Sequence, residues 1–240
     1  MGAVKPGTIA SYHCILRAWF NWLVKEGTLT KSPMITLTAP VDRPDDILPF
    51  THEQVEMLLK AAFSSDYPYR DKVILLILLD TGLRASELVS LKYGDINTQD
   101  HSIRVEGKGG KSRSVWFGAR TTRALWDYIR QEPRSKTDPL FWSEHHRENG
   151  PGLTRSGLSQ LFRRLKATTG LQENVRCSPH TCRNTFAVNF LRNGGDQFTL
   201  MRILGHTDVK MTARYVNFVN ADIARSSRMN SPMDRMLDKG

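Results

Sequence analysis

Three short segments of the sequence combine side chains that can act on a phosphate with the turn residues that would present them. In the first segment an arginine follows a glycine turn and precedes a short helix. In the second, a histidine and an arginine three residues apart share one face of a helix. In the third, a histidine lies in a turn and a tyrosine follows on the next helix. The segments are 80–96, 178–186 and 204–218, and these residues are Arg84, His180 with Arg183, and His206 with Tyr215.

Together these residue types are suited to breaking a phosphodiester. Two guanidinium groups match a phosphate with paired hydrogen bonds, and two imidazoles can donate to its oxygens or move protons. A tyrosine can attack and form a covalent intermediate, while the positive side chains stabilise the transition state. Each residue alone also has an ordinary structural explanation. Arg84 can pair with Glu87, His180 can cap its helix, and Tyr215 can be a core aromatic residue.

A fourth stretch, EGKGGKSRS at 106–114, ends in a Gly-Lys-Ser that is typical of a phosphate-binding P-loop. The P-loop needs a glycine five residues before Gly110, and Val105 stands there. The flanks are β-branched or apolar with partial alternation, so the stretch predicts a β-hairpin with lysines at its tip. Such lysines are common at exposed turns, but one on a mobile hairpin can also deliver a proton to a leaving oxygen.

The bulk properties narrow the class of protein. The 240 residues carry a formal net charge of +10, which favours an anionic partner, most often nucleic acid. The longest apolar run, Val73–Leu79, is too short to span a bilayer, and the first residues show no signal-peptide pattern, so we expect none. We therefore expect a cytoplasmic protein without a membrane partner. The spacing of Cys177, His180 and Cys182 fits no standard zinc site, so we expect no metal and no cofactor.

The pattern of apolar residues predicts a mainly α chain with one small antiparallel β-sheet, an α+β fold. Thr51 and Gln54 form a capping-box pattern at the start of one helix. The hairpin lies between a short helix at 86–91 and a longer one, and residues 132–152 are expected to be a long polar loop. The other predicted helices are 8–26, 71–80, 119–131, 154–169, 179–193, 196–204 and 208–218.

Three regions are expected along the chain. Residues 1–45 hold only one convincing helix, which cannot bury its own apolar face, so they predict a partial helical domain that is truncated or unusually small. Prolines and acids at 38–50 indicate a linker, and residues 46–220 carry all the chemistry. The region 221–240 is a polar tail in which Met229, Met233, Met236 and Leu237 recur at helical spacing.

The ordered series of segments resembles the tyrosine recombinases, also called phage integrases, most closely their Xer-like and transposon integrase branch. The resemblance covers residues 8–220. TGLRASEL is similar to the segment around the family's first catalytic arginine, and HTCRNTFA to its His-x-x-Arg box. LGHTDVKMTARYV is similar to its Leu-Gly-His followed by the nucleophile, and EGKGGKSRSV to its hairpin. The catalytic residues so implied are Arg84, Lys108, His180, Arg183, His206 and Tyr215, with Lys111 as the alternative lysine.

The resemblance implies a recombinase catalytic domain at 46–220, preceded by a partial core-binding domain. It also implies a function, namely cutting and rejoining DNA through a 3′-phosphotyrosyl link without metal or ATP. The partners would be double-stranded DNA and other protomers, as a dimer or tetramer on DNA, with the 221–240 tail docking on a neighbour. Cys182 and Asn184 depart from the box, which usually reads His-x-Leu-Arg-His.

Two alternatives keep the same fold: a DNA-binding accessory protein without catalysis, and a relaxing enzyme like the type IB topoisomerases. Further basic residues are candidates for contact with DNA, although each can also be a solvated surface charge. They are Lys92, Lys111, Arg155, Arg163, Arg164 and Lys166.

Overall fold

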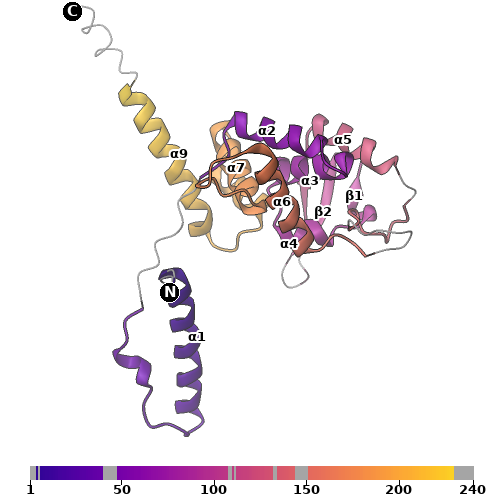
Figure 1. Ribbon diagram of the computed structural model, residues 1–240. Coiled ribbons are helices and arrows are strands. Elements are labelled where there is room, and N and C mark those ends of the chain that lie inside the picture. The colour runs from indigo at the N-terminus through magenta and orange to yellow at the C-terminus, as the bar shows by residue number, and fades with distance from the viewer. Residues whose placement is uncertain are drawn as a thin grey trace, which may run out of the picture. The chain divides into compact units, whose positions relative to one another are not determined.

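The computed structural model describes residues 4, 6–39, 48–107, 110, 112–131, 134–143 and 151–229, with the backbone alone for 222, 223 and 225–229. The chain divides into two compact units, Met1–Asp46 and Ile47–Gly240. Figure 1 shows the helices and strands of each unit along the chain.

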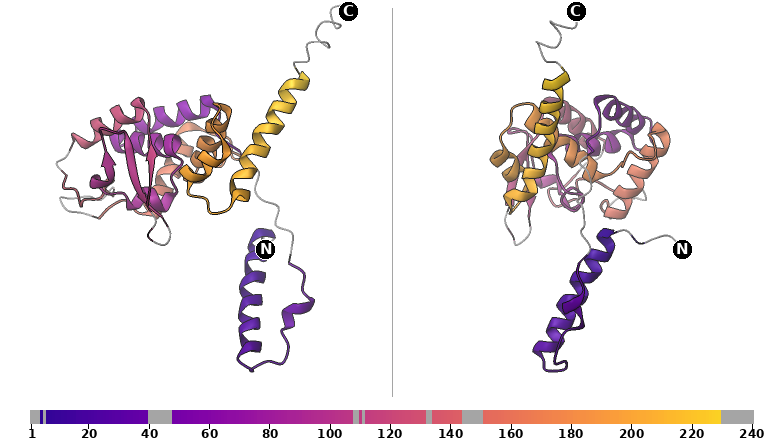
Figure 2. Two further views of the ribbon diagram at one scale, coloured as in Figure 1. Left: turned by 180° about the vertical axis from the view of Figure 1, so that it is seen from behind. Right: turned by 90° about the vertical axis from the view of Figure 1, so that its left-hand side faces the viewer.

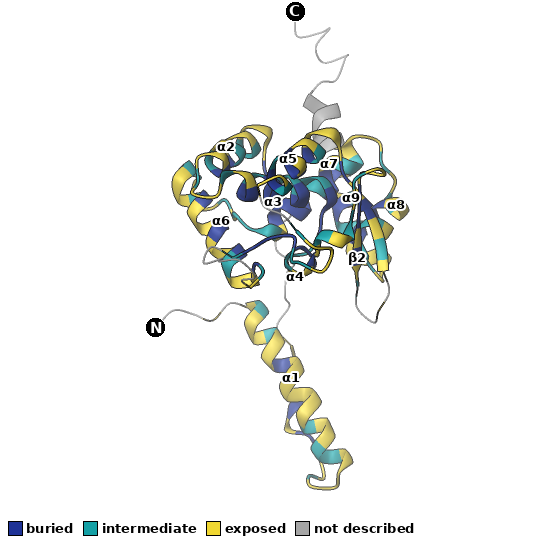
Figure 3. Cartoon of the chain, turned by 90° about the vertical axis from the view of Figure 1, so that its right-hand side faces the viewer, coloured by how far each residue is buried: buried dark blue, intermediate teal, exposed yellow. Residues whose placement is uncertain are grey.

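The first unit is built on one long helix, as the sequence predicts. Helix α1 spans Pro6–Lys25 and is followed by a short 3-10 helix, η1, at Pro33–Thr36. His13 is the buried residue of α1, and its Nε2 lies 3.0 Å from the carbonyl oxygen of Leu37. Most of the helix is exposed (Figure 3). The exposed apolar side chains of α1 are Ile9, Tyr12, Ile15, Leu16, Trp19 and Trp22.

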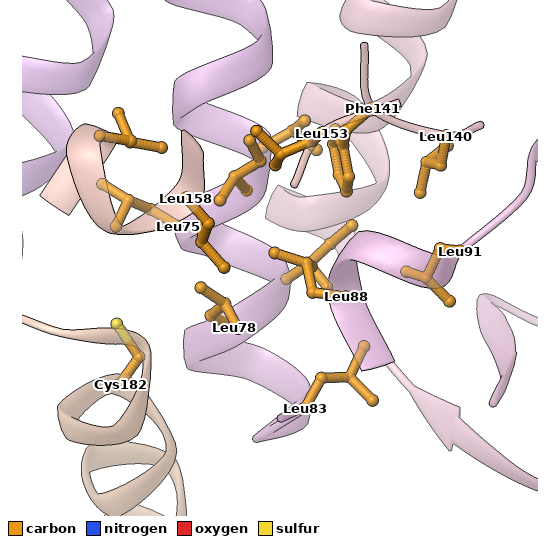
Figure 4. Packing of buried hydrophobic residues seen from close by; sticks show 14 of the residues in the cluster. Leu75, Leu78, Leu83, Leu88, Leu91, Leu140, Phe141, Leu153, Leu158 and Cys182 are labelled. Carbon is orange, nitrogen blue, oxygen red and sulfur yellow. The ribbon is translucent and has the colours of Figure 1, made fainter. Parts of the chain in front are cut away.

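The second unit is organised around helix α3, Pro68–Thr81, which the sequence predicts to be buried on nearly all sides. Val73, Ile74 and Leu78 are fully buried, because α3 packs against α2 (His52–Phe63), α5 (Ala119–Ile129) and α7 (Pro179–Arg192). Figure 4 shows leucines of α3 meeting leucines from the neighbouring segments. The predicted capping box at the start of α2 is confirmed.

The predicted hairpin is confirmed and belongs to a three-stranded antiparallel sheet. Its strands are β1 (Ile96–Asn97), β2 (Ser102–Glu106) and β3 (Ser112–Trp116), in that spatial order. Ile103 of β2 pairs with Val115 of β3, and both side chains are fully buried. The register therefore turns one face of the hairpin to the core, as the alternation of residues requires. Figure 2 gives two further views of the helices and strands.

The other helices follow the predicted order, and the expected α+β fold class is confirmed. They are α4 (Ala85–Ser90), η2 (Tyr93–Asp95), α6 (Arg155–Thr169), α8 (Gln197–Leu204) and α9 (Val209–Met229). The predicted end of the last helix at Phe218 is wrong, since α9 continues to Met229. Polarity suggested a stop at Asn220, but residues 219–229 contain neither glycine nor proline, so nothing interrupts the hydrogen-bond ladder.

A second, smaller core joins α7, α8 and α9. It comprises Ala187, Val188, Leu200, Leu204, Tyr215 and Val219. The predicted nucleophile is thus a core residue in this structure. Its ring is held by the packing of three helices rather than presented on the surface.

Candidate active site

Arg84 is held at the junction of α3 and α4. Helix α3 ends at Gly82, whose φ of 63° is left-handed, and Arg84 is the N-cap residue of α4. The Arg84 backbone N–H donates to Oε2 of Glu87 at 2.8 Å, and its Nη1 donates to Oε1 at 3.0 Å. Its Nη2 donates to the carbonyl oxygen of Gly205 at 3.3 Å. The side chain remains 38% exposed, so part of the guanidinium faces solvent.

Glu87 also holds Arg113, a residue to which the sequence assigns no role. Arg113 on β3 donates from Nη1 and Nη2 to the two carboxylate oxygens of Glu87, each at 2.9 Å, and from Nε to the carbonyl oxygen of Ile203 at 2.8 Å. One buried carboxylate therefore ties the hairpin strand to Arg84. Burial raises the pKa of Glu87, but the hydrogen bonds from Arg113 and Arg84 outweigh it and leave that pKa below its usual value.

Arg183 lies within the protein, only 4% exposed, on the first turns of α7. Its Nη1 donates to the carbonyl oxygen of Gly82 at 2.6 Å, and its Nη2 donates to that of Leu204 at 2.8 Å. Burial, and after it the charge of Arg84, lowers the pKa of Arg183 to about 10. The group therefore stays positively charged at neutral pH.

His206 is oriented by two hydrogen bonds that determine its tautomer. Its Nε2 lies 2.9 Å from Nη2 of Arg183, and its Nδ1 lies 2.8 Å from Oγ1 of the buried Thr212. A guanidinium can only donate, so Nε2 accepts and the hydrogen is on Nδ1. Burial, followed by the charges of Arg183 and Arg84, lowers the pKa of His206 to about 4. His206 is therefore neutral at pH 7 and orients Arg183.

Tyr215 is 2% exposed and lies beside His206. The two rings are nearly parallel, at an angle of 8°, with centroids 6.5 Å apart. The hydroxyl of Tyr215 donates to Oδ1 of Asn184 at 2.9 Å. Burial raises the pKa of Tyr215, and the charges of Arg183, Arg214 and Arg84 partly oppose that effect. The phenol is therefore protonated at neutral pH.

Five of the six predicted catalytic residues line one cavity of about 370 Å³: Arg84, His180, Arg183, His206 and Tyr215. His180 is exposed at the start of α7. Met211 and Arg214 of α9 also line the cavity and were not predicted from the sequence. The site is thus assembled from α4, α7 and α9 and from the turn after α8.

A second cavity, of about 670 Å³, adjoins the first and shares Arg84, His206 and Met211 with it. Gly107 and Ser112, at the inner ends of the hairpin, line this second cavity. Lys108 and Lys111 themselves lie outside the described residues. Gly107 and Ser112, which precede and follow them in the chain, line the same cavity as Arg84.

Apart from Lys111, which lies outside the described residues, the predicted DNA-contact residues do not line either cavity. Lys92 is exposed before η2, and Arg155, Arg163 and Arg164 are exposed on α6. The Nζ of Lys166 donates to the carbonyl oxygens of Glu173 and Val175, each at 2.9 Å. Lys166 therefore holds the segment that leads into α7.

Cys182, one of the three residues whose spacing was compared with zinc sites, is fully buried in the structure. Among the described residues, no group of three or more His, Cys, Asp or Glu side chains is placed to hold a metal ion. Among the same residues, no helix has both the length and the apolar character that crossing a bilayer requires.

Comparison with known proteins assigns the family. The model of the phage integrase family matches residues 49–221. The tyrosine recombinase XerD of Listeria innocua serovar 6a is 32% identical over 220 residues, covering 89% of this chain and 72% of that protein. The tyrosine recombinase XerC of Herpetosiphon aurantiacus is 32% identical over 221 residues, covering 89% and 70%.

Solved structures share the fold of this chain. The crystal structure of XerA recombinase shares 27% identity at a TM-score of 0.65, covering 95% of this chain and 86% of that one. XerH site-specific recombinase, solved as a post-cleavage complex with a palindromic difH substrate, has a TM-score of 0.75 at 21% identity, covering 93% and 67%. The chain belongs to the phage integrase family. Within it, the chain is a tyrosine recombinase of the Xer-like type.

Proposed function

We propose that this recombinase cuts and rejoins DNA at specific sites with Tyr215 as its nucleophile. One observation carries the proposal. Arg84, Arg183, His206 and Tyr215 come from the three segments 80–96, 178–186 and 204–218 and line a single cavity. Two guanidinium groups beside a phenol are suited to a phosphodiester, because they stabilise the charge that develops on the phosphoryl oxygens.

In the proposed reaction the Tyr215 oxygen attacks the scissile phosphorus. A bond forms between phosphorus and the tyrosine oxygen, and the bond from phosphorus to the 5′-oxygen breaks. His180, exposed at the edge of the cavity, assists removal of the phenolic proton. Lys108 gives a proton to the leaving 5′-oxygen. The 3′-phosphotyrosyl link keeps the energy of the broken bond, so rejoining is the reverse reaction and neither ATP nor a metal ion takes part.

Within this scheme Arg84 is the more accessible of the two clamping groups. Its side chain is 38% exposed, whereas Arg183 is enclosed by carbonyl oxygens. His206 accepts from Arg183 and so orients it toward the phosphate. Neutral His206 is suited to this role, because an imidazolium would repel the guanidinium that it holds.

The surface and the flanking regions would bind DNA and neighbouring protomers. The net charge of +10 favours a polyanion, and Lys92, Lys111, Arg155, Arg163, Arg164 and Lys166 remain candidates for phosphate contacts. Residues 1–45 would add a second DNA contact as a partial core-binding domain. Beyond α9, Met233, Met236 and Leu237 lie outside the described residues, and we propose that this region docks on another protomer of a dimer or tetramer on DNA.

The test is a trapping assay with nicked DNA that carries a candidate site, in the presence of EDTA and without ATP. We expect a protease-sensitive covalent adduct on a denaturing gel, and its loss in Tyr215→Phe. A footprint on the same DNA without any adduct would refute the cleavage reaction and favour an accessory protein that only binds. Relaxation of supercoiled DNA without exchange between two sites would instead favour a topoisomerase-like enzyme.

The choice between Lys108 and Lys111 needs a second substrate. Replacing the 5′-oxygen by sulfur provides a leaving group that needs no proton. We expect Lys108→Ala to cut normal DNA slowly and the sulfur substrate at the wild-type rate. Lys111→Ala is the matched control. It should cut normal DNA only slightly more slowly than the wild type, and the sulfur substrate should not change that difference in rate. Rescue of Lys111→Ala alone would assign the general acid to that residue.

A further inference from the structure

Asn184, the residue directly after the His-x-x-Arg box, has no role in the reaction as proposed, yet it contacts Tyr215, the proposed nucleophile. It follows Arg183 on α7 and is 6% exposed. Its Oδ1 accepts the hydrogen bond from the Tyr215 hydroxyl at 2.9 Å. The two residues are 31 positions apart and come from α7 and α9, so only the packing of these helices brings them together.

This hydrogen bond directs the phenolic hydrogen to an amide that cannot remove it. His206 lies beside Tyr215, but its ring faces the tyrosine ring, and its two nitrogens contact Arg183 and Thr212. His206 in this arrangement is therefore not the base for Tyr215. Tyr215 is only 2% exposed as a residue, and its hydrogen bond to Asn184 is itself buried, so the hydroxyl is engaged inside the protein rather than presented to a phosphate.

We propose that Asn184 is a positioning residue that holds the Tyr215 hydroxyl protonated and inside the core until DNA is bound. The attack on phosphorus then requires that this hydrogen bond break and that the Tyr215 hydroxyl turn from Asn184 toward a phosphate bound in the cavity. The inference rests on the proposed function, because it takes Tyr215 as the nucleophile.

The charges around Tyr215 explain why such a restraint matters. Arg183 of α7, Arg214 of α9 and Arg84 at the start of α4 all favour the phenolate, while neutral His206 adds no charge. Burial disfavours the phenolate and has the largest effect on the pKa of Tyr215, which is raised. A hydrogen bond donated by the phenol favours the protonated form further. When the hydroxyl leaves Asn184 for the cavity, both the hydrogen bond and the burial that favour the protonated phenol are reduced. The three arginines, which favour the phenolate, remain beside Tyr215.

Two substitutions at Asn184 have opposite expected effects on the tyrosine. Asn184→Asp keeps the shape and the acceptor but adds a negative charge, so the pKa of Tyr215 should rise by about one unit. Asn184→Ala removes the acceptor, so that pKa should fall by a similar amount. A residue needed only for packing would not shift the titration in opposite directions. Asn189→Asp puts the same charge on an exposed position of α7 and should leave the titration unchanged.

The first measurement uses the full chain without DNA. Phenolate absorbance near 295 nm is followed against pH, and the Tyr215→Phe curve is subtracted to isolate Tyr215. The second measures the rate of adduct formation on nicked DNA at neutral pH. We expect Asn184→Asp to slow adduct formation at least tenfold, and Asn184→Ala to match or exceed the wild-type rate.

The outcomes separate this inference from the proposed function. If both Asn184 variants leave the titration of Tyr215 unchanged, or slow cleavage equally, Asn184 does not position the tyrosine and the inference is wrong. If the wild-type protein binds its site but forms no adduct, the proposed function fails at Tyr215, whatever the titrations show. Opposite shifts in titration with the matching rates would support the inference.

Discussion

Replacing Glu87 with glutamine should destabilise the second unit by about 3 kcal/mol at neutral pH, because it removes one partner of a buried ion-pair network. The carboxylate is 7% exposed and accepts four hydrogen bonds, two from Arg84 and two from Arg113. A charge-assisted hydrogen bond contributes roughly 1.5–3 kcal/mol. The glutamine amide keeps one oxygen acceptor, but its N–H₂ group would face a guanidinium that can only donate. The positive charges of Arg84 and Arg113 would therefore be left without a balancing negative charge.

The loss is measurable as a shift in thermal unfolding. For a unit of this size, 1 kcal/mol corresponds to roughly 2–4 °C, so the Tm of Glu87→Gln should fall by about 6–12 °C. Circular dichroism at 222 nm follows the transition. Glu106→Gln is the control, because Glu106 is an exposed carboxylate at the end of β2 and its replacement should change the Tm little.

The pH dependence gives a second test. The pKa of Glu87 in the folded protein is lowered from its ordinary value of 4.5, so the folded state binds this proton less readily than the unfolded state. The stability that Glu87 contributes is therefore present above about pH 4.5 and is lost as pH falls through the lower folded pKa. The Tm difference between wild type and Glu87→Gln should therefore become smaller as pH falls below about 4.5. A difference below 2 °C at pH 7, or one independent of pH, would refute the reasoning.

Three further predictions concern the residues around the site. His206 should titrate with a pKa of about 4 in NMR spectra, in which its signals are assigned by comparison with His206→Gln. Because this pKa lies below the ordinary 6.5, neutral His206 contributes stability that is complete above pH 6.5 and declines as pH falls toward 4. Titration near 6.5 would contradict the effects of burial and of the neighbouring arginines on His206. Thr212→Val should slow adduct formation roughly 10- to 100-fold, because Nδ1–H of His206 loses its buried acceptor; an unchanged rate would show that the tautomer is unimportant. Gly82→Ala should cost at least about 2 kcal/mol in urea unfolding, since the new Cβ would lie 2.5 Å from the Phe186 ring at a left-handed φ. Gly194→Ala, also left-handed but with open space around its Cβ, should cost only about 1–2 kcal/mol, and equal losses would show that the close contact is relieved.

Local patterns in the sequence determined much of the fold. The Thr51–Gln54 capping box, the apolar residues of α3 and the alternation in the hairpin each depend on neighbours within a few positions, so their periods indicate the structure directly. The end of α9 could not be placed, because polar residues without a helix breaker are compatible with both helix and loop. The types and order of the residues that line the cavity were likewise visible in the sequence, through their resemblance to one family.

The state of those residues was decided by tertiary structure. Arg113 and Glu87 are 26 positions apart, and Tyr215 and Asn184 are 31 apart, so no local period relates them. Burial is a property of packed helices, and burial makes His206 neutral and keeps Tyr215 protonated. The sequence therefore shows which side chains are available for chemistry. The packing of α7, α8 and α9 determines their protonation, their partners and the direction in which the tyrosine hydroxyl points.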